Sequence, residues 1–296
     1  MRKITATVCS HFEGRLIKDF LREELGFSSS LIKRVKFGGV FVNEKNVHMR
    51  QILNTGDTVS VNFAEEESPH VAPVNQKITV LYEDEYILAV DKPQNMPTHP
   101  SRYNSLVTLA ETVRAYIGRP FVFRAITRLD RDTSGIVLIA KDQLTASILS
   151  ADMKASKFEK QYCAILARAP EACEGVVDAP IEREAPNSIK RTVREDGKPS
   201  FTRYRISGIL PDGRAICYLT PITGRTHQIR VHMAHIGAPL YNDFLYGKRV
   251  NDGSYFLRCC KLSFLHPYTR ERITVSTSAF EDVKKTAAEE ISVDFN

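Results

Sequence analysis

The pattern of apolar and polar positions predicts a small α/β unit at the start of the chain. In residues 14–25, GRLIKDFLREEL, apolar side chains recur at helical spacing, and Gly26 follows as a stop signal. Residues 28–39, SSSLIKRVKFGG, begin with serines suited to a helix N-cap and end on a glycine pair. The segments VFVNEKNV and GDTVSVNF then predict a strand leading into a turn and an alternating strand.

A linker separates this unit from the rest of the chain. The segment AEEESPHVAPVNQ is acidic, contains two prolines and lacks apolar periodicity. The sequence therefore predicts a first domain over residues 1–65, a linker over 66–76 and a larger domain over 77–282. The last residues, 283–296, are rich in acids and predict a helical or frayed tail.

The sequence pattern of the larger domain predicts mainly strands. IVLIA, at 136–140, is apolar at every position, which predicts a strand buried on both faces. Further strands are predicted in ITVLYEDEYILAVDKP, in EKQYCAILAR and in a hairpin around PDG that joins SFTRYRISGIL to RAICYLTPI. Helical spacing is found in 143–153 and in 226–237. Many strands with few helices favour an α+β fold.

The composition is that of a soluble globular protein, with 43% hydrophobic and 26% charged residues among 296. The net charge of +6 only weakly favours a polyanionic partner. No apolar run approaches the roughly 20 residues of a membrane span, and no apolar leader is present, so we expect a cytoplasmic protein without a membrane partner. The six cysteines form no C-x-x-C pair, and two are adjacent, so we expect reduced and mostly buried thiols.

Basic residues gather in the second predicted helix and the turn after it. They are Lys33, Arg34, Lys36, Lys45 and Arg50, against a single acid between residues 31 and 50. A solvated helix face and a surface that grips a phosphate backbone both remain open. Residues 13–63 resemble the S4-like RNA-binding domain, which implies that these basic residues bind structured RNA.

The segment TRLDRDTSGIVLIAK sets Asp130 between Arg128 and Arg131, directly before the fully apolar strand. If residues 128–130 are extended, Arg128 and Asp130 point the same way, because side chains alternate along a strand. A nearby guanidinium favours the ionised carboxylate. Spacing alone leaves open whether this is a salt-bridged turn or a charged group held for chemistry at the edge of a rigid core.

The segment PITGRTHQIRVHMAHIGAPLYNDFLYG offers Arg225 and Arg230, which could reach a carboxylate or a phosphate. It also contains His227, His232 and His235. Without an H-E-x-x-H arrangement or a convergent Cys or Glu, packing or hydrogen bonding is the better interpretation of these histidines than a metal site.

Lys160 and Tyr162 lie in EKQYCAI, on a predicted strand. Tyrosine on a strand is usually a core residue. A tyrosine near a nucleic-acid site can also present its ring to an unstacked base.

These segments together resemble the RluA/RluD-type pseudouridine synthases. RLDRDTSGIVLIAK resembles the family signature around the catalytic aspartate, KQYCAIL its K-x-Y motif and TGRTHQIRVHMAHIGAPLYND its third block. AVDKPQNMPTHPS resembles the first segment of the catalytic domain. Two positions depart from the family: Thr127 stands where His is usual, and Asn95 where Gly is usual. Asparagine tolerates positive φ better than most residues, so the second change is mild.

The resemblance implies a mixed, largely antiparallel, bent central sheet and an enzyme that isomerises uridine in RNA. The target nucleotide has to be flipped out of its stack, at a cost of a few kcal/mol. Asp130 would then perform the chemistry, Arg128 fill the gap in the stack, Tyr162 pack on the uracil and Arg225 pair with Asp130. Lys160 would support the site, and Arg230 would contact RNA. No metal or organic cofactor is implied, and we expect a monomer.

Several alternatives remain open at this stage. Asp130 could act as a nucleophile or as a base that takes a proton from the sugar. A glycosidase would need a carboxylate pair, such as Asp130 with Asp132 or Glu182 with Glu184, but nothing in the sequence aligns either pair. A non-catalytic RNA-binding or ribosome-assembly factor would tolerate the loss of Asp130. Large-subunit ribosomal RNA is the favoured substrate, with tRNA as the alternative.

Overall fold

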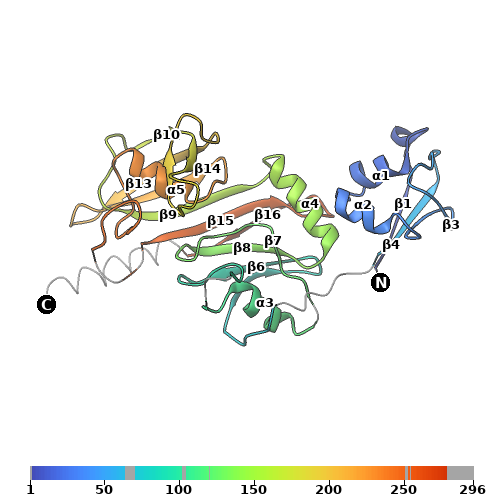
Figure 1. The fold of residues 1–296 in the computed structure, drawn as a ribbon, viewed down its shortest axis with the longest axis horizontal. Helices are drawn as coiled ribbons and strands as arrows, with labels where there is room; N and C mark the ends of the chain where they lie inside the picture. Colours follow the sequence, from blue (N-terminus) through green and yellow to red (C-terminus); the bar gives the residue numbers. More distant parts are fainter. Residues whose placement is uncertain are drawn as a thin grey trace.

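The computed structural model describes residues 2–63, 71–101, 105–119, 121–250, 253 and 255–278. Within them, the N-terminal region and the larger region each have a hydrophobic core of their own (Figure 1). The predicted tail and residues 66–70 of the predicted linker lie outside the described residues. After that segment, the backbone N–H of Val74 donates to the carbonyl oxygen of Glu111 at 3.2 Å, which attaches the chain to the larger region.

The N-terminal domain is a sheet with two helices. Its strands are β1 (Arg2–Thr7), β2 (Val40–Val42), β3 (Lys45–Asn46) and β4 (Thr58–Phe63), in the order β1-β4-β2-β3. Both predicted helices are present as α1 (Ile17–Glu23) and α2 (Ser29–Val35). The Ser28 hydroxyl caps α2 by accepting the Leu31 N–H at 3.3 Å, as its sequence predicts. Strand β1 was not predicted and pairs with β4 along its whole length.

The larger domain is built on one long mixed sheet, which confirms the predicted α+β fold. The sheet has the order β10-β13-β14-β9-β15-β8-β6-β5, with β16 on β15 and β7 on β8. Its strands are β5 (Thr79–Glu83), β6 (Ile87–Lys92), β7 (Arg124–Ala125), β8 (Ser134–Ala140), β9 (Glu159–Leu166), β10 (Glu174–Asp178), β13 (Phe201–Ile209), β14 (Ala215–Pro221), β15 (Leu257–Leu265) and β16 (Arg272–Ser276). Only β15 and β8 pair in parallel in this sheet; the other pairs are antiparallel.

Three helices and a separate hairpin complete this domain. The helices are α3 (Leu109–Ile117), α4 (Gln143–Lys154) and α5 (Gln228–His235). α3 begins with a capping box between Thr108 and Glu111. The hairpin of β11 (Ile181–Arg183) and β12 (Arg191–Val193) packs against α5.

The centre of the sheet is β8, in which all seven residues are buried as the apolar run predicts. Gly135 has φ of +108°, and a Cβ there would lie 2.2 Å from the carbonyl oxygen of Cys259 in β15. Only glycine therefore allows β15 to run beside the residue that follows the Asp130 loop. The position where the sequence changes from charged loop to apolar strand is also where two parallel backbones approach most closely.

The two domains contact each other through α4, which lies between them in Figure 1. Leu144 is buried in the core of the N-terminal domain, and Ile148 packs against it. The Ser147 hydroxyl donates to the carbonyl oxygen of Gly26 at 2.6 Å, and the Arg34 guanidinium donates to Gln143. The N-terminal domain is thereby docked on the helix that follows the central strand.

None of the helices in the described segments combines the length and hydrophobicity that crossing a membrane requires. All six cysteines lie in described segments and are free thiols, as predicted. Four are buried and two, Cys9 and Cys173, are exposed.

Candidate active site

Asp130 lies in the loop between β7 and β8, at the entrance to the central strand. Its side chain is 37% exposed. The residues before it alternate, since Leu129 is buried and Arg128 is exposed, so the predicted extended geometry holds. Arg128 and Asp130 thus lie on the open side of a loop whose other side is in the core.

Backbone contacts fix this loop on both sides of Asp130. The Thr98 hydroxyl donates to the carbonyl oxygen of Leu129 at 2.8 Å, and the Met96 N–H donates to that of Arg131 at 3.2 Å. Thr127, where the resembled family usually has His, is buried, and its hydroxyl accepts the N–H of Leu138 in β8 at 2.9 Å. The loop is therefore anchored to the buried strand and to the segment after β6.

Lys92, at the end of β6, is fully buried beneath the same loop. Its ammonium donates to the carbonyl oxygens of Pro93 at 2.9 Å, Met96 at 2.7 Å and Arg131 at 3.0 Å. Burial lowers the pKa of Lys92 to about 8, although the neighbouring charges of Asp132, Asp130 and Asp91 oppose this. In this segment Asn95 has φ of 55°, the conformation that its sequence position anticipates.

Tyr162 of β9 is buried in the core of the larger domain, with 9% of its surface exposed. Burial raises its pKa well above the ordinary value, and the nearby charges of Cys259 and Asp130 add to this. Lys160, two residues earlier, is directed to Met153 in α4, with its Nζ 3.9 Å from the Met153 sulfur. The charge of Asp130 therefore reaches the buried Tyr162, whereas Lys160 is directed to α4.

The two arginines of the third motif, Arg225 and Arg230, have different surroundings in the structure. Arg225 is exposed and donates from Nε and Nη2 to the carbonyl oxygen of Pro199, at 3.3 and 3.2 Å. Arg230 is buried, and its Nε and Nη2 donate to the two oxygens of Asp243, both at 2.7 Å. Its guanidinium also lies over the rings of Tyr255 at 4.4 Å and Tyr246 at 4.8 Å.

The electrostatics of Arg230 agree with this placement. Burial opposes its charge, but the hydrogen bonds that it donates to Asp243 and the charges of Tyr255, Asp243 and Asp130 raise its pKa above the ordinary value. The family resemblance implied that Arg225 pairs with Asp130 and that Arg230 contacts RNA. In the folded chain, Arg230 is enclosed in the site because both faces of α5 are covered.

Arg131 and His227 complete the surroundings of the carboxylate. Arg131 does not pair with Asp130 but donates to both oxygens of Asp132, at 2.9 and 2.8 Å. His227 approaches from the start of α5, with Nε2 3.8 Å from Asp130 Oδ2. Its Nδ1 lies 2.7 Å from the Tyr246 hydroxyl. The imidazole of His227 thus faces the carboxylate, and the charge of Asp130 also acts on the buried Tyr162 and Arg230.

Comparison with known proteins decides what this arrangement is. The family model for RNA pseudouridylate synthases matches residues 86–235. The chain is 36% identical to the Bacillus subtilis protein called uncharacterized RNA pseudouridine synthase YjbO, over 88% of this chain and 95% of that one. It is 34% identical to ribosomal large subunit pseudouridine synthase D of Xanthomonas campestris, over 87% and 82%.

The chain belongs to the RNA pseudouridylate synthase family. It is an isomerase that acts on RNA, as the resemblance of its motifs implies. It is also 33% identical to ribosomal large subunit pseudouridine synthase C of Escherichia coli K12, over 92% of both chains. The solved structure of human RNA pseudouridylate synthase domain containing 1 has the same fold, with a TM-score of 0.57 and 24% identity over 68% of this chain and 83% of that one.

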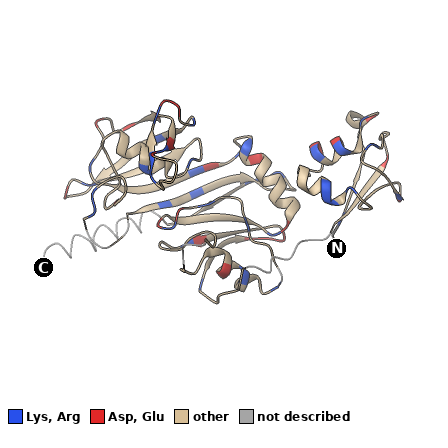
Figure 2. Ribbon diagram, in the orientation of Figure 1, with Lys and Arg blue, Asp and Glu red and all other residues tan. Residues whose placement is uncertain are grey.

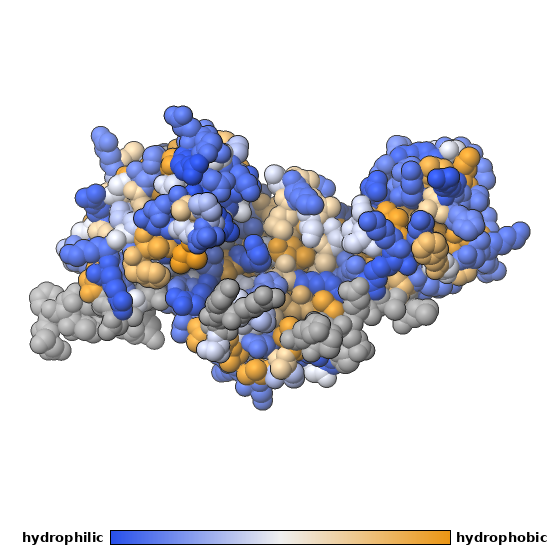
Figure 3. All heavy atoms as spheres, in the orientation of Figure 1, coloured by the Kyte–Doolittle hydropathy of each residue, from blue (hydrophilic) through white to orange (hydrophobic). Residues whose placement is uncertain are grey.

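The basic residues of this synthase's N-terminal domain are mostly on the surface. Lys33, Lys36, Lys45 and Arg50 are exposed, whereas Arg34 contacts Gln143 in the catalytic domain. Figure 2 shows blue basic segments on both helices of the domain, and the face seen in Figure 3 is mainly hydrophilic. Arg34 therefore serves domain docking, while the other four residues are placed to meet a polyanion.

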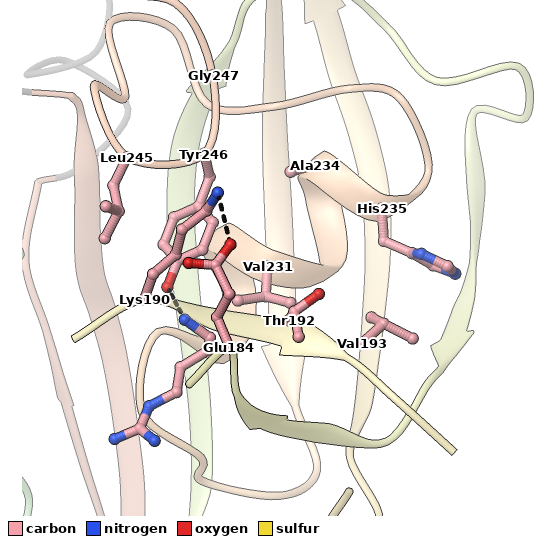
Figure 4. A pocket seen from close by; sticks show the side chains of 11 residues that line it. Glu184, Lys190, Thr192, Val193, Val231, Ala234, His235, Leu245, Tyr246 and Gly247 are labelled. Carbon is pink, nitrogen blue, oxygen red and sulfur yellow. Dashed lines mark hydrogen bonds and ion pairs between the residues drawn. The ribbon is translucent and has the colours of Figure 1, made fainter. Parts of the chain in front are cut away.

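A pocket of about 460 Å³ lies next to the active site, between α5, the β11–β12 hairpin and the 245–247 loop (Figure 4). Lys190 and Glu184 form an ion pair at its wall, with 3.1 Å between Nζ and Oε1. Tyr246 belongs to both the pocket and the active site, because its ring lines the pocket while its hydroxyl contacts His227.

The three histidines of the α5 region have separate surroundings in this synthase. His232 is buried between the Thr202 hydroxyl and the carbonyl oxygen of Ala179, each at 2.9 Å. His235 lines the pocket, and His227 faces Asp130. Hydrogen bonding is thus what His227 and His232 do here. Over the part of the chain that the structure describes, no cluster of three or more His, Cys, Asp or Glu side chains could hold a metal ion.

Sequence reasoning missed three residues around the carboxylate. For Lys92 the sequence contains one weak signal, which is that the lysine stands between an apolar strand and a proline. His227 was expected to pack or to form hydrogen bonds, without a link to Asp130, and Tyr246 was not considered. Their partners come from elements far apart in the sequence, so spacing along the chain contains no signal for the contacts.

Proposed function

We propose that this synthase converts uridine to pseudouridine in large-subunit ribosomal RNA, with Asp130 as its catalytic group. The observation that carries the proposal is the placement of Asp130. It is a partly exposed carboxylate on a loop anchored at Leu129 and Arg131, and its charge acts on the buried Tyr162 and Arg230. Rigid placement of a reacting group within a fraction of an ångström is what such chemistry requires.

The proposed reaction breaks the bond between C1′ and N1 of the uridine and forms a bond between C1′ and C5. The hydrogen on C5 leaves to solvent, and N1 gains a proton, so the isomerisation needs no redox partner. Asp130 either attacks as a nucleophile or removes a proton from the sugar. Tyr162 packs on the detached uracil, and the exposed Arg128 enters the stack that the flipped nucleotide leaves.

Ribosomal RNA is proposed because two of the relatives are named ribosomal large subunit pseudouridine synthases. The exposed lysines of the N-terminal domain support a large structured RNA, since they extend the basic surface beyond the active site. Transfer RNA is the second candidate, and it is an outcome of the same experiment.

The test measures tritium release from unmodified ribosomal RNA and tRNA transcripts that are labelled at C5 of uridine. The protein, its Asp130→Asn variant and a control with an exposed aspartate changed, Asp178→Asn, are compared. We expect release from ribosomal RNA with the first and third proteins and none above background with Asp130→Asn. Equal release by Asp130→Asn would overturn the catalytic assignment, and release only from tRNA would overturn the substrate. Free uracil in place of pseudouridine would indicate a glycosidase.

A further inference from the structure

His227 has a backbone conformation that needs an explanation. It stands just before α5 with φ of 57° and ψ of 15°, in the left-handed region, and its side chain makes no capping hydrogen bond. A residue with a Cβ loses roughly 1–2 kcal/mol in that region. Such strain persists where the surrounding structure requires it, and it is concentrated at functional sites. The strained backbone here directs the imidazole at Asp130, with Nε2 3.8 Å from Oδ2.

The partners of its two ring nitrogens favour one tautomer of His227. The backbone N–H of Arg191 donates to the Tyr246 hydroxyl at 2.9 Å, and a backbone amide can only donate. The tyrosine oxygen accepts from Arg191, and its own hydrogen can point at His227 Nδ1, 2.7 Å away. Nε2 faces Oδ2 of Asp130, and an ionised carboxylate can only accept, so these contacts favour Nδ1 as the acceptor. With Nδ1 as an acceptor, the hydrogen of a neutral imidazole is on Nε2, the atom that faces Asp130.

Charged groups from four segments surround this ring. Burial lowers the pKa of His227 most strongly. The negative charges of Asp130 and Asp243 raise this pKa, whereas the positive charges of Arg230 in α5 and Arg191 in β12 lower it. The imidazole is accordingly neutral at pH 7. It can offer an N–H to the carboxylate without placing a positive charge beside it.

We infer that His227 is a positioning residue for Asp130: its Nε2–H holds Oδ2, so that Oδ1 is presented to the flipped nucleotide. The inference rests on the proposed catalytic role of Asp130. A separation of 3.8 Å is longer than a direct hydrogen bond, and a small movement of the loop on RNA binding would close it. Hydrogen bonds at active sites are often long before the substrate arrives.

Protonation of His227 would undo this arrangement. A second hydrogen on Nδ1 would face the Tyr246 hydroxyl, which would have to turn its own hydrogen away. The new charge beside Asp130 would stabilise the carboxylate at rest and weaken it as a nucleophile or base. The rate should therefore fall as the pH drops through the His227 pKa, which is below the ordinary value of about 6.5.

The test uses substitutions chosen for the backbone at position 227. Glycine adopts a positive φ without strain, so His227→Gly removes the imidazole and leaves the start of α5 intact. We expect kcat for tritium release to fall roughly 100-fold, the size expected for a misplaced reacting group, while KM stays within about two-fold. Exogenous imidazole should restore part of the rate. The exposed histidine of the same helix provides the control, and His235→Gln should behave as the unchanged protein does.

His227→Gln provides the second readout, because its amide N–H can take the place of Nε2–H but does not titrate. It should recover much of the rate that His227→Gly loses, and its activity should no longer fall as the pH drops through the His227 pKa. If His227→Gly lowers the melting temperature of the protein, Tyr246→Phe provides an alternative test. This variant leaves position 227 unchanged and removes only the tyrosine hydroxyl. Tyr246→Phe should reduce kcat and shift the pH at which the rate falls on the acid side of the pH–rate profile.

Two results would overturn the inference. One is an unchanged kcat in His227→Gly, and the other is the same fall in rate at low pH in the unchanged protein and in His227→Gln. The experiment also separates this inference from the proposed function. Activity in Asp130→Asn would contradict the proposed catalytic role of Asp130. An inactive Asp130→Asn together with a fully active His227→Gly would contradict only the role of His227. In an Asp130→Asn background, His227→Gly should have no further effect, because the two residues act as one unit.

Discussion

The ammonium of Lys92 donates to the carbonyl oxygen of Arg131 at 3.0 Å, which ties the end of β6 to the residue that follows Asp130. The lysine is fully buried, and it meets two further carbonyls on its own segment. A charge placed so deep is retained only when such oxygens surround it. This contact therefore links the stability of the central sheet to the position of the Asp130 carboxylate.

Replacing Lys92 with methionine should destabilise the protein by roughly 2–4 kcal/mol, because it leaves three carbonyl oxygens without their charged donor. The Asp130 loop should also loosen, which would lower kcat more than it raises KM. Urea unfolding and steady-state tritium release measure the two effects. The exposed Lys154 of α4 provides the control, and Lys154→Met should change neither. An equally stable Lys92→Met variant would contradict this account.

The lowered pKa of Lys92, about 8, also gives a pH dependence. Below pH 8 the folded protein carries the cost of the buried charge in full. Between pH 8 and about 10.5 the folded chain releases this proton while the unfolded chain retains it, so stability from this group rises with pH. The difference in unfolding free energy between the unchanged protein and Lys92→Met should therefore be larger at pH 9.5 than at pH 7. A constant difference would place the lysine's pKa near its ordinary value.

Gly135→Ala should be among the most damaging small substitutions in the chain. The added Cβ would lie 2.2 Å from the carbonyl oxygen of Cys259, at a residue whose φ is +108°. We expect a loss of roughly 2–4 kcal/mol from backbone strain and overlap. Gly208→Ala is a matched control, because a Cβ there meets no atom within 4 Å. Thermal unfolding distinguishes the two variants, and similar melting temperatures would contradict the close approach of β8 and β15.

Neutralising the exposed lysines of the N-terminal domain should weaken RNA binding and flatten its salt dependence. The double variant Lys33→Gln/Lys36→Gln should lower the slope of log K against log salt by about 0.7–0.9 per lysine. Lys18→Gln, on the first helix of the same domain, is the control. Point substitutions are preferable to removing residues 1–65, because Leu144 and Ile148 would then lose their apolar cover. Unchanged affinity at several salt concentrations would remove this surface from the RNA interface.

A thiol-reactive probe should label Cys9 and Cys173 rapidly in the native protein and the other four only on unfolding. Burial raises the pKa of Cys163, Cys217 and Cys259 to about 12 and that of Cys260 to about 11, so almost no thiolate is present at pH 8. Mass spectrometry after brief labelling identifies the modified residues. Rapid modification of Cys259 would mean that the sheet beneath Tyr162 opens readily.

The sequence alone determined the elements whose pattern is local and the family to which the chain belongs. An apolar run predicted the buried β8, helical spacing predicted α1, α2, α4 and α5, and the motifs around Asp130 and Tyr162 predicted the reaction class. These features depend on residues that are neighbours along one element, so their periodicity is visible in the linear chain. Strand β15, the parallel neighbour of β8, was not predicted. It carries Arg258 and Lys261 between its apolar residues, and its place between β8 and β9 is a long-range pairing.

Only the tertiary structure decided which side chains meet Asp130. Arg225 and Arg230 stand five residues apart in one motif, and the packing of α5 encloses the second and leaves the first against Pro199. His227 reaches the carboxylate through a left-handed backbone that no spacing rule anticipates, and its tautomer depends on Tyr246 and Arg191 from other segments. A motif specifies the residue types that a site needs, whereas the burial and approach of separate elements determine the contacts each one makes.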